Sequence, residues 1–492
     1  MDAVIAANAI LTVLYPDQTA IGGDCFFLVF DATSGETIGY NGSGRAAAAA
    51  TADQLLSQGY EAMPAKGGAT ITVPGTIDAW LSGHDRYGRL EFERLLQPAI
   101  ELARDGFPVS PRLGSVLVAQ ESLIREWPRL RSLLYRDGSI PPSGSLLAMP
   151  ELARTLRSIA SGGRAAFYDG PIAEAISASA QDSGGWLIQE DLASHEGEWI
   201  APIELDYDGI TVQTFPPNSQ GITALIGLGM MAAEESGAAW GTARHAHPLI
   251  EAAKLAHAVR DARIADPRFT EIDSAEMLSS EFLEALWLSY DPDRAGPGQP
   301  DIAGDTVYLC AVDRDGNAVS LIQSLFGAFG SCVVAGDTGI ILQNRGAYFS
   351  LNAGSLNFLE PGKRTLHTLM PSMLLRDGAL LGPVGTQGGD AQAQIQMQLI
   401  SNVIDFGMEP QEAIEAPRWI TGTTESSRPS VVIESGFPEG TVAGLSARGH
   451  QMTVVEPWNP GAGHAQMILV DSQSGVLKGG ADPRADGAAS GY

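Results

Sequence analysis

The 492-residue sequence predicts a globular protein of the α+β class. Hydrophobic residues make up 44% of the chain, which suffices for one large core or for two to three ordinary ones. Apolar residues at helical spacing mark several segments, and the stretch that follows residue 305 is rich in apolar β runs. Both kinds of element are therefore expected in one compact protein.

Four segments carry the helical pattern. The first 15 residues have apolar positions on nearly every side, which is typical of a buried helix. Residues 92–103 follow helical spacing and end at Gly106, where glycine commonly closes a helix. Two further helices are expected from Pro248 to Ala265 and from about Asp390 to Asp405.

The strands are predicted by continuous apolar runs. Residues 21–31 join a glycine turn to a run that suits a strand covered on both faces. Residues 282–305, rich in proline and glycine, predict a flexible and exposed stretch that is open to cutting. The later strands are expected at 306–312, 317–325, 332–335, 339–343 and, as the last one, 465–471.

The composition excludes several classes of partner. With 30 Lys and Arg against 58 Asp and Glu, binding to nucleic acid or to an anionic membrane is disfavoured. No run of about 18 apolar residues predicts a membrane span. Three cysteines without C-x-x-C spacing imply neither a disulfide framework nor a zinc site, and a reducing cytosol fits them. Asp2 stands where a secretory signal would be basic, so we expect a cytoplasmic protein.

His245 and His247 resemble a pair of metal ligands. No carboxylate or third histidine was found at suitable helical spacing, and a helix is expected to begin just after them at Pro248. We therefore predict neither a metal site nor a cofactor.

The hairpin that follows residue 305 can be registered from its turn. Arg314 to Gly316 suits a three-residue loop with Gly316 in the left-handed conformation, which pairs Asp313 with Asn317. Counting back along both strands brings Ser324 opposite Thr306, about 5 Å away on the same face of the sheet.

Thr306 is the candidate nucleophile. A threonine at a chain N-terminus has an α-amine, with an ordinary pKa of about 8, that can accept the proton of its own hydroxyl. Ser324 could hold the amine and the hydroxyl in place. The alternative is an ordinary strand threonine, because threonine favours strands.

Gly388 and Gly389 belong to a glycine turn that runs into the helix expected near Asp390. Backbone N–H groups at such a turn, near the positive end of a helix, suit the binding of a tetrahedral oxyanion. The alternative is a tight strand-to-helix turn with Asp390 as the N-cap.

A longer pattern surrounds these residues. The sequence from Asp305 to Ser320, with Phe329 to Ser331 and Val334 to Gly336, resembles the start of the small subunit in the gamma-glutamyltranspeptidase family. The resemblance covers nearly the whole chain in order, at Gly22–Asp24, Pro74–Gly75, Pro216–Pro217, Glu251–Ala252, Asp266–Pro267, Gly388–Gly389 and Gly480–Arg484.

The resemblance implies an N-terminal-nucleophile hydrolase fold. This fold is a four-layer αββα sandwich in which two stacked, mainly antiparallel sheets lie between helical layers. The resemblance also implies self-cleavage between Asp305 and Thr306, which divides one domain into a large chain of residues 1–305 and a small chain of residues 306–492. These chains would act as one pair or as a homodimer of such pairs.

The resemblance assigns roles to five residues. Thr306 is the nucleophile, Ser324 is the supporting hydroxyl residue, and Gly388 with Gly389 form the oxyanion hole. Arg45 matches the arginine that receives the carboxylate of the substrate. Taken alone, Arg45 is more typical of an exposed loop charge.

The chain departs from the family where the substrate binds. Family members that act on gamma-glutamyl groups hold the ammonium with an amide side chain, a glutamine and an aspartate, and here those positions are Phe326, Arg345 and Tyr348. Where the family has a serine pair that helps to bind the carboxylate, this chain has His367 and Thr368.

These departures predict the substrate. Arg345 beside Arg45 would repel an ammonium and attract a carboxylate. We therefore expect a small amide whose acyl group carries a carboxylate but no α-ammonium, such as an oxamate-like compound or a dicarboxylic mono-amide.

Three functions remain open from the sequence. The first is an amide hydrolase that works through a Thr306 acyl-enzyme with water as acceptor. The second is a gamma-glutamyltransferase or glutathione hydrolase, in which amino acids or water accept the same acyl group. The third is an uncut, catalytically silent binding protein on this fold.

Overall fold

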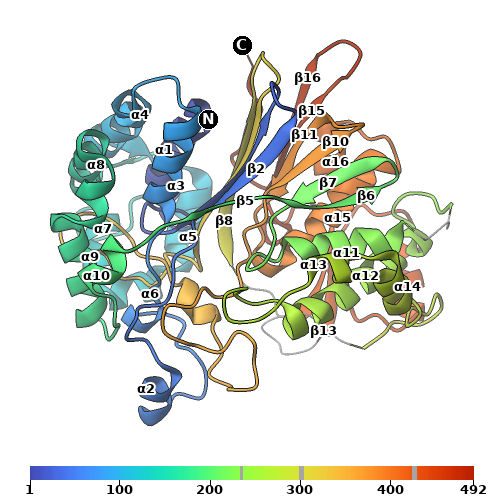
Figure 1. Ribbon diagram of the computed structural model, residues 1–492, viewed down its shortest axis with the longest axis horizontal. Coiled ribbons are helices and arrows are strands. Elements are labelled where there is room, and N and C mark those ends of the chain that lie inside the picture. Colours follow the sequence, from blue (N-terminus) through green and yellow to red (C-terminus); the bar gives the residue numbers. More distant parts are fainter. Residues whose placement is uncertain (233–236, 298–303, 424–428, 492) are drawn as a thin grey trace.

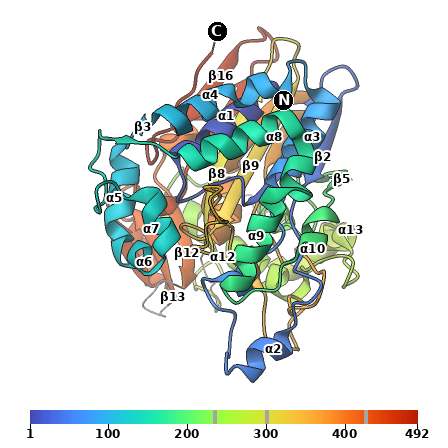
Figure 2. The ribbon, with the colours of Figure 1, turned by 90° about the vertical axis from the view of Figure 1, so that its left-hand side faces the viewer.

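Two stacked β-sheets between two layers of helices form the centre of the molecule (Figure 1). The structure is a computed structural model that describes residues 1–232, 237–297, 304–423 and 429–491. Seen from the side, helices α4, α8 and α9 lie in front of strands β8 and β9 (Figure 2). This arrangement confirms the α+β class and the αββα layering expected for the chain.

The first sheet carries the segment that begins at residue 305. All of its neighbouring strands are antiparallel. Its order is β5 (Glu198–Ile200), β2 (Glu36–Asn41), β1 (Asp24–Asp31), β9 (Ala318–Phe326) and β8 (Asp305–Val312).

The second sheet is also antiparallel throughout. Its order is β16 (Leu477–Ala481), β15 (Ala465–Val470), β11 (Ala379–Thr386), β10 (Ser372–Arg376), β7 (Ile210–Thr214) and β6 (Ile203–Tyr207). Two small sheets complete the set, formed by β12 (Trp419–Thr423), β13 (Pro429–Glu434) and β14 (Met452–Val455), and by β3 (Phe107–Pro108) and β4 (Leu146–Leu147).

Helices from the first part of the chain lie on the side of the first sheet, and later ones lie on the side of the second (Figure 1). The early helices are α1 (Asp2–Leu14), α2 (Ala52–Ser57), α3 (Thr76–Tyr87), α4 (Phe92–Asp105), α5 (Pro111–Ala119), α6 (Glu121–Glu126), α7 (Pro128–Leu134), α8 (Pro150–Tyr168), α9 (Pro171–Asp182) and α10 (Gln189–Ala193). The later helices are α11 (Gly221–Met231), α12 (Ala243–Arg263), α13 (Ser274–Met277), α14 (Ser280–Trp287), α15 (Gln392–Ile404), α16 (Pro410–Glu415) and α17 (Thr441–Ala447).

Strand β1 shows why its sequence lacks polar alternation. Phe26, Leu28 and Phe30 pack in the apolar cluster between the two sheets, while Phe27 and Val29 pack in the cluster shared with the early helices. Successive side chains of a strand point to opposite faces, so a strand with helices on one face and a sheet on the other must be apolar throughout. The continuous run in the sequence predicted this burial correctly.

The helix predicted from Pro248 begins earlier than expected. Helix α12 starts at Ala243 and carries Pro248 in its second turn, because burial of its apolar side chains outweighs the one helical hydrogen bond that a proline cannot donate. His247 is therefore helical, and Glu251, four residues further on, lies on the same face. The statement that no carboxylate stands at suitable helical spacing from His247 was wrong.

Two predicted strands are absent from the described structure. Residues 332–335 and 339–343 make only isolated bridges, such as the one between Val334 and Ile341. In the segment 332–335, Cys332 has φ +64°. A strand requires a negative φ, so the backbone is not extended where this segment begins.

Two other predictions need correction. The strand at residues 465–471 is β15, but it is not the last one, because β16 follows it. The stretch 282–305 is helical at its start, where it belongs to α14, and its residues 298–303 lie outside the described part of the chain.

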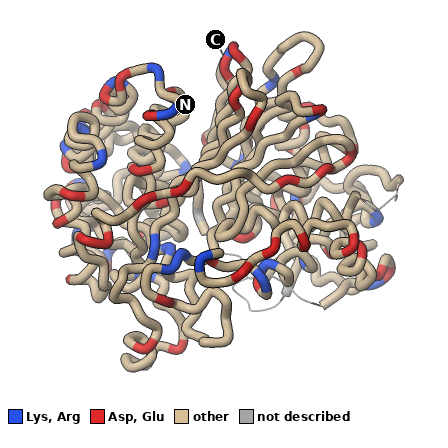
Figure 3. The backbone as a smooth tube through the Cα atoms, viewed as in Figure 1, with Lys and Arg blue, Asp and Glu red and all other residues tan. Residues whose placement is uncertain are grey.

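Acidic residues occur along the chain in both helical layers and at the sheet ends (Figure 3). Among the described residues, none of the helices combines the length and the apolar character that crossing a membrane requires.

We predict that the protein loses stability as the pH falls from about 6.5 towards 4, because buried histidines must take up protons when it unfolds. Burial lowers the pKa of His195, His367 and His464 to about 4, whereas an unfolded histidine titrates near 6.5. The free energy of unfolding is therefore unaffected by these histidines above pH 6.5. Below pH 6.5 it falls by roughly 1.4 kcal/mol per pH unit for each histidine. Urea unfolding at pH 7.5 and pH 5.5 measures the effect, and equal free energies of unfolding would contradict the prediction.

Candidate active site

The hydroxyls of Thr306 and Ser324 meet at the ends of strands β8 and β9. Thr306 Oγ1 donates to Ser324 Oγ over 3.3 Å, and both residues are buried. Ser324 Oγ also accepts the backbone N–H of Phe326 over 2.7 Å, which fixes its rotamer. The hairpin turn that sets this register has Gly316 at φ +87°, in the left-handed region that the sequence predicted.

A β-bulge modifies the predicted pairing at this point. The expected register holds from Val312 opposite Ala318 to Val307 opposite Gln323 and then shifts, so that Asp305 pairs with Phe326. One residue of β8, Thr306, therefore faces two residues of β9. Bulges change the direction of a side chain and recur beside active sites.

The turn after strand β11 carries the two glycines predicted to bind an oxyanion. Gly388 has φ +144° and Gly389 has φ +54°, backbone angles that residues with a Cβ rarely adopt. Their N–H groups donate to no acceptor among the described residues. The turn leads into a short 3-10 helix, η3 (Gly389–Ala391), and α15 begins at Gln392, so the alternative in which Asp390 is the N-cap is wrong.

Gln220 holds this turn from the second sheet's side. Its Nε2 donates to the carbonyl of Gly389 over 2.9 Å and to the carbonyl of Thr368 over 3.0 Å. Its Oε1 accepts from Arg260 Nη1 over 2.8 Å. The loop between β7 and α11, where Gln220 lies, thus joins the glycine turn to the segment that contains His367 and Thr368.

Asp390 is the charged centre of the same network. Its Oδ1 accepts from Arg260 Nη1 over 2.5 Å and from the hydroxyl of Tyr348. His257 Nε2 lies 3.1 Å from the carbonyl oxygen of Asp390. Burial, with the charge of Asp390, raises the pKa of Tyr348 well above its ordinary value, so this hydroxyl stays protonated and donates.

Arg345 is a fully buried cation beside this network. It starts the 3-10 helix η2 (Arg345–Tyr348), and its Nη1 donates to Thr368 Oγ1 over 3.1 Å. Its guanidinium carbon lies 4.3 Å from the ring centre of Phe326. Nε and Nη2 have no hydrogen-bond partner among the side chains that the structure describes. Burial lowers the pKa of Arg345 to about 10, which leaves the group charged at neutral pH.

His367 is bonded to Asp24 of strand β1. His367 Nδ1 accepts from the N–H of Leu369 over 3.2 Å, so Nε2 carries the proton and donates to Asp24 Oδ2 over 3.1 Å. Burial lowers the pKa of His367 to about 4, and the ring is neutral at pH 7. Burial alone would raise the pKa of Asp24, but the hydrogen bond from His367 and the charge of Arg345 bring it below its ordinary value.

Arg45 lies in a different charge cluster. Its guanidinium pairs with Glu198 over 2.9 Å and with Asp266 over 3.2 Å. The hydrogen-bond partners of the Arg45 side chain and of the Arg345 side chain have no residue in common. The two guanidinium groups therefore make separate contacts, and the expectation that they act side by side on a substrate stays a prediction.

Gly304, one residue before Asp305 of the predicted cleavage bond, lies against the glycine turn. Gly304 has φ +118°, and a Cβ built on it would stand 3.1 Å from the Cα of Gly389. The same Cβ would stand 3.4 Å from the ring of Phe326. The uncut segment thus runs between the two glycines and the aromatic wall of the site.

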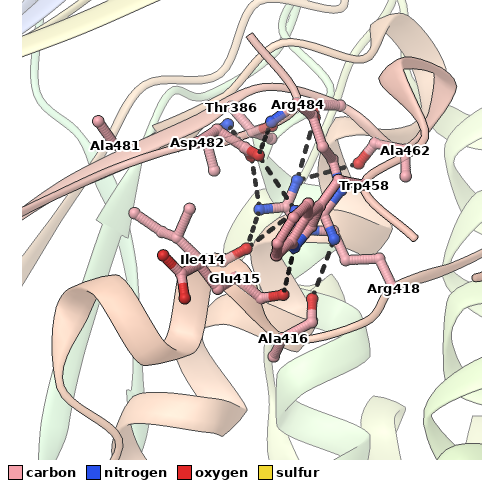
Figure 4. A network of polar contacts seen from close by, with 12 residues as sticks. Thr386, Ile414, Glu415, Ala416, Arg418, Trp458, Ala462, Ala481, Asp482 and Arg484 are labelled. Atoms are coloured by element: carbon pink, nitrogen blue, oxygen red, sulfur yellow. Dashed lines mark hydrogen bonds and ion pairs between the residues drawn. The ribbon is translucent and has the colours of Figure 1, made fainter. Parts of the chain in front are cut away.

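A buried ionic network lies behind this site (Figure 4). Asp482 pairs with Arg418 over 2.7 Å and with Arg484 over 3.1 Å. Arg484 also pairs with Glu434, and all four side chains are buried. Each charged side chain in the network is surrounded by opposite charges and carbonyls. The network therefore holds the C-terminal strands in place without leaving a buried charge unpaired.

This network reaches the glycine turn through one loop. Arg418 Nη1 donates to the carbonyls of Ala462 and Gly463, over 3.0 and 3.1 Å. In the next residue, the carbonyl of His464 accepts the N–H of Gln387 over 2.9 Å. The position of Gly388 therefore depends on charges that lie outside the site.

The family model described as gamma-glutamyltranspeptidase matches residues 1–492. The chain belongs to the gamma-glutamyltranspeptidase family. It is similar to a glutathione hydrolase-like YwrD proenzyme of Bacillus subtilis, with 40% identity over 100% of this chain and 93% of the relative. It is also similar to an oxamate amidohydrolase proenzyme of Klebsiella pneumoniae, with 37% identity over 100% and 94% of the two chains.

Among solved structures, a cephalosporin acylase from Bacillus halodurans is similar with a TM-score of 0.93. The identity is 37%, over 100% of this chain and 91% of that chain. Membership of the family makes this protein a hydrolase proenzyme with the N-terminal-nucleophile fold, whose precursor is cleaved into two chains.

Sequence reasoning missed the supporting residues of this family site. Asp24 belongs to a matched motif, but no role was predicted for it. Arg260 belongs to a predicted helix, and no role was predicted for it either. Gln220 follows the matched Pro216–Pro217 motif and had no role assigned to it. No spacing rule connects any of them to Thr306, since they come from other elements of the fold.

We predict that Gln220→Ala lowers kcat on an amide substrate by about 10- to 100-fold, because the glycine turn loses the side chain that holds it. The carbonyls of Gly389 and Thr368 would also lose a donor inside the protein. Steady-state kinetics on processed protein measures the effect, with Gln97→Ala on the exposed face of helix α4 as the control. An unchanged kcat in a folded Gln220→Ala protein would show that the turn does not need this support.

Proposed function

We propose that this chain is a self-processing amide hydrolase that works through an acyl-enzyme on Thr306, and that the acyl group of its substrate carries a carboxylate and no α-ammonium. The observation that carries the proposal is the buried Arg345, whose guanidinium has two nitrogens without a described partner. The proposal also locates the cut between Asp305 and Thr306, which gives chains of residues 1–305 and 306–492.

Processing begins with the hydroxyl of Thr306. Its oxygen attacks the carbonyl carbon of Asp305, the C–N bond breaks, and the proton moves to the nitrogen that becomes the free α-amine. Water then hydrolyses the ester, which leaves a carboxylate on Asp305 and the hydroxyl on Thr306. The hydrogen bond of 3.3 Å from Thr306 to Ser324 supports the attack by holding the Thr306 hydroxyl in a fixed direction.

Turnover repeats the same chemistry on a substrate amide. The α-amine of Thr306 accepts the hydroxyl proton as the oxygen attacks, and the negative charge that develops on the substrate oxygen is met by the N–H groups of Gly388 and Gly389. The nitrogen of the substrate leaves with a proton, and water releases the acid. Two backbone donors on a rigid turn suit an oxyanion, because they need no reorganisation during the reaction.

The charge of Arg345 supports a carboxylate on the acyl group. An unpaired buried cation is costly, and it costs less when an anion with matching geometry binds to it. A guanidinium can donate two parallel hydrogen bonds to a carboxylate, and Nε and Nη2 are the free pair. Thr368 holds the third nitrogen and so sets the plane of the group.

The same surroundings disfavour an α-ammonium. Arg345 would repel it. Asp390, the carboxylate of this network, already accepts from Arg260 and Tyr348. Small dicarboxylic mono-amides and oxamate therefore fit better than gamma-glutamyl compounds, and the oxamate amidohydrolase name of one relative agrees with this substrate class.

We predict that purified protein contains pieces of about 32 and 20 kDa, from shares of 305/492 and 187/492 of 51.7 kDa. Thr306→Ala is expected to abolish both the cut and turnover, whereas Ser324→Ala slows both because it removes only the support. Intact mass and Edman sequencing of the small chain give the readout. A single uncut band would favour a silent binding protein, and activity in Thr306→Ala would overturn the mechanism.

We predict that Arg345→Met lowers kcat/KM on carboxylate-bearing amides by about 30- to 1,000-fold, the usual loss when one partner of a buried charge pair is removed. Assays with oxamate, glutaryl anilide and gamma-glutamyl anilide on processed protein measure it. Processing should survive, because the mutated side chain holds the substrate and does not attack it.

Arg131→Met on helix α7 is the control, since Arg131 is exposed. Arg45→Met tests whether the arginine assigned by the family resemblance also contributes. A clear preference of the unmodified protein for gamma-glutamyl anilide would reject the substrate proposal and favour the gamma-glutamyltransferase alternative.

A further inference from the structure

We propose that His247, Glu251 and His450 form a binding site for one divalent transition-metal ion, with zinc as the best match. The site is separate from the residues around Thr306. Two imidazoles and one carboxylate are the ligand set that zinc, nickel and cobalt accept, whereas magnesium and calcium prefer oxygen ligands.

The three ligands converge from two parts of the chain. His247 and Glu251 lie four residues apart on one face of α12, and His450 follows helix α17. His247 Nδ1 lies 2.8 Å from His450 Nε2, and His450 Nε2 lies 3.6 Å from Glu251 Oε1. All three ligand atoms lie within 4.8 Å of one another, and all three residues are buried. Pairs of ligand atoms 2.8 and 3.6 Å apart can share one ion at bonds of about 2.0–2.2 Å.

A backbone contact orients the first ligand. His247 Nε2 lies 2.9 Å from the carbonyl of Asp291, so Nε2 carries the proton and Nδ1 has its lone pair turned towards His450. Metal-binding histidines usually donate their second ring N–H to a carbonyl or carboxylate in this way. The contact is therefore the one expected around a metal ligand.

Both rings are neutral at physiological pH, which metal binding requires. Burial lowers the pKa of His450 to about 3 and also lowers the pKa of His247. Few protons compete with an ion near pH 7.

Lys254 is the natural competitor of the ion. Its ammonium lies 2.8 Å from Glu251 Oε1, while Glu251 Oε2 accepts the N–H of Gly296 over 2.9 Å. A carboxylate oxygen has a second lone pair, so Oε1 can accept from Lys254 and still face an ion. The positive charge weakens binding, and removing it should tighten binding.

A cavity lies beside the cluster. Its volume is about 540 Å³, and its wall includes Ser289, Asp291, Arg294 and residues 295–297. Two of these lining residues also contact the cluster, because Asp291 accepts from His247 and Gly296 donates to Glu251. The site therefore joins α12 to the segment that leads, in sequence, towards the Asp305–Thr306 bond.

Titration calorimetry of the full chain, treated with a chelator and dialysed, tests the proposal with ZnCl₂ alone. We expect one ion per chain, and with CoCl₂ an absorption spectrum of a nitrogen- and oxygen-ligated ion. His450→Ala and the isosteric Glu251→Gln should each weaken Zn²⁺ binding by at least about tenfold. Lys254→Met should tighten it.

His245→Ala is the matched control, since His245 lies on the same helix and its Nδ1 accepts only from the N–H of Gly241. Its binding should equal that of the unmodified chain. Circular dichroism shows whether each variant is folded. Absence of Zn²⁺ binding at millimolar concentration, or equal binding by folded His450→Ala and Glu251→Gln, would overturn the proposal.

Discussion

The packing of the two sheets against each other determines the active site, because neither sheet contains it alone. Thr306 and Ser324 come from the first sheet, and the glycine turn follows a strand of the second. The sheets approach so closely at Gly385 that an added Cβ would stand 2.3 Å from the ring of Tyr308. An apolar seam of aromatic and aliphatic side chains fills the space between them. Since interiors are packed as tightly as crystals, this seam sets the distance between nucleophile and oxyanion donors.

Buried charges then fix the direction of the polar groups. Arg260, Asp390 and Gln220 tie the glycine turn to the segment of Thr368, and the Arg418 and Asp482 network holds the loop behind it. Such groups are expensive to bury and are tolerated only when each finds its partner. Their energetic role is therefore to specify one arrangement of the site more than to stabilise the fold.

Arg345 stands out against that background, because it is buried with part of its hydrogen-bonding capacity unused. Elsewhere in the site charged groups are paired within the protein, as Asp390 is with Arg260. A buried guanidinium with two nitrogens that lack a described hydrogen-bond partner is suited to a ligand that supplies a carboxylate. The family relationship gives the reaction, and this difference between Arg345 and its neighbours gives the proposed choice of substrate.

The sequence by itself determined the family, the layering of helices and sheets, and the meeting of Thr306 with Ser324. The family and the layering came from the resemblance of the matched motifs, whereas the meeting of Thr306 with Ser324 follows from a local rule, since one turn with Gly316 sets the register of a hairpin. Only the tertiary structure decided that Gln220 supports Gly389, that Arg45 pairs with Glu198, and that His450 meets Glu251. The reason is physical: those contacts join residues far apart in the chain, and packing between layers, which no spacing in the sequence encodes, brings them together.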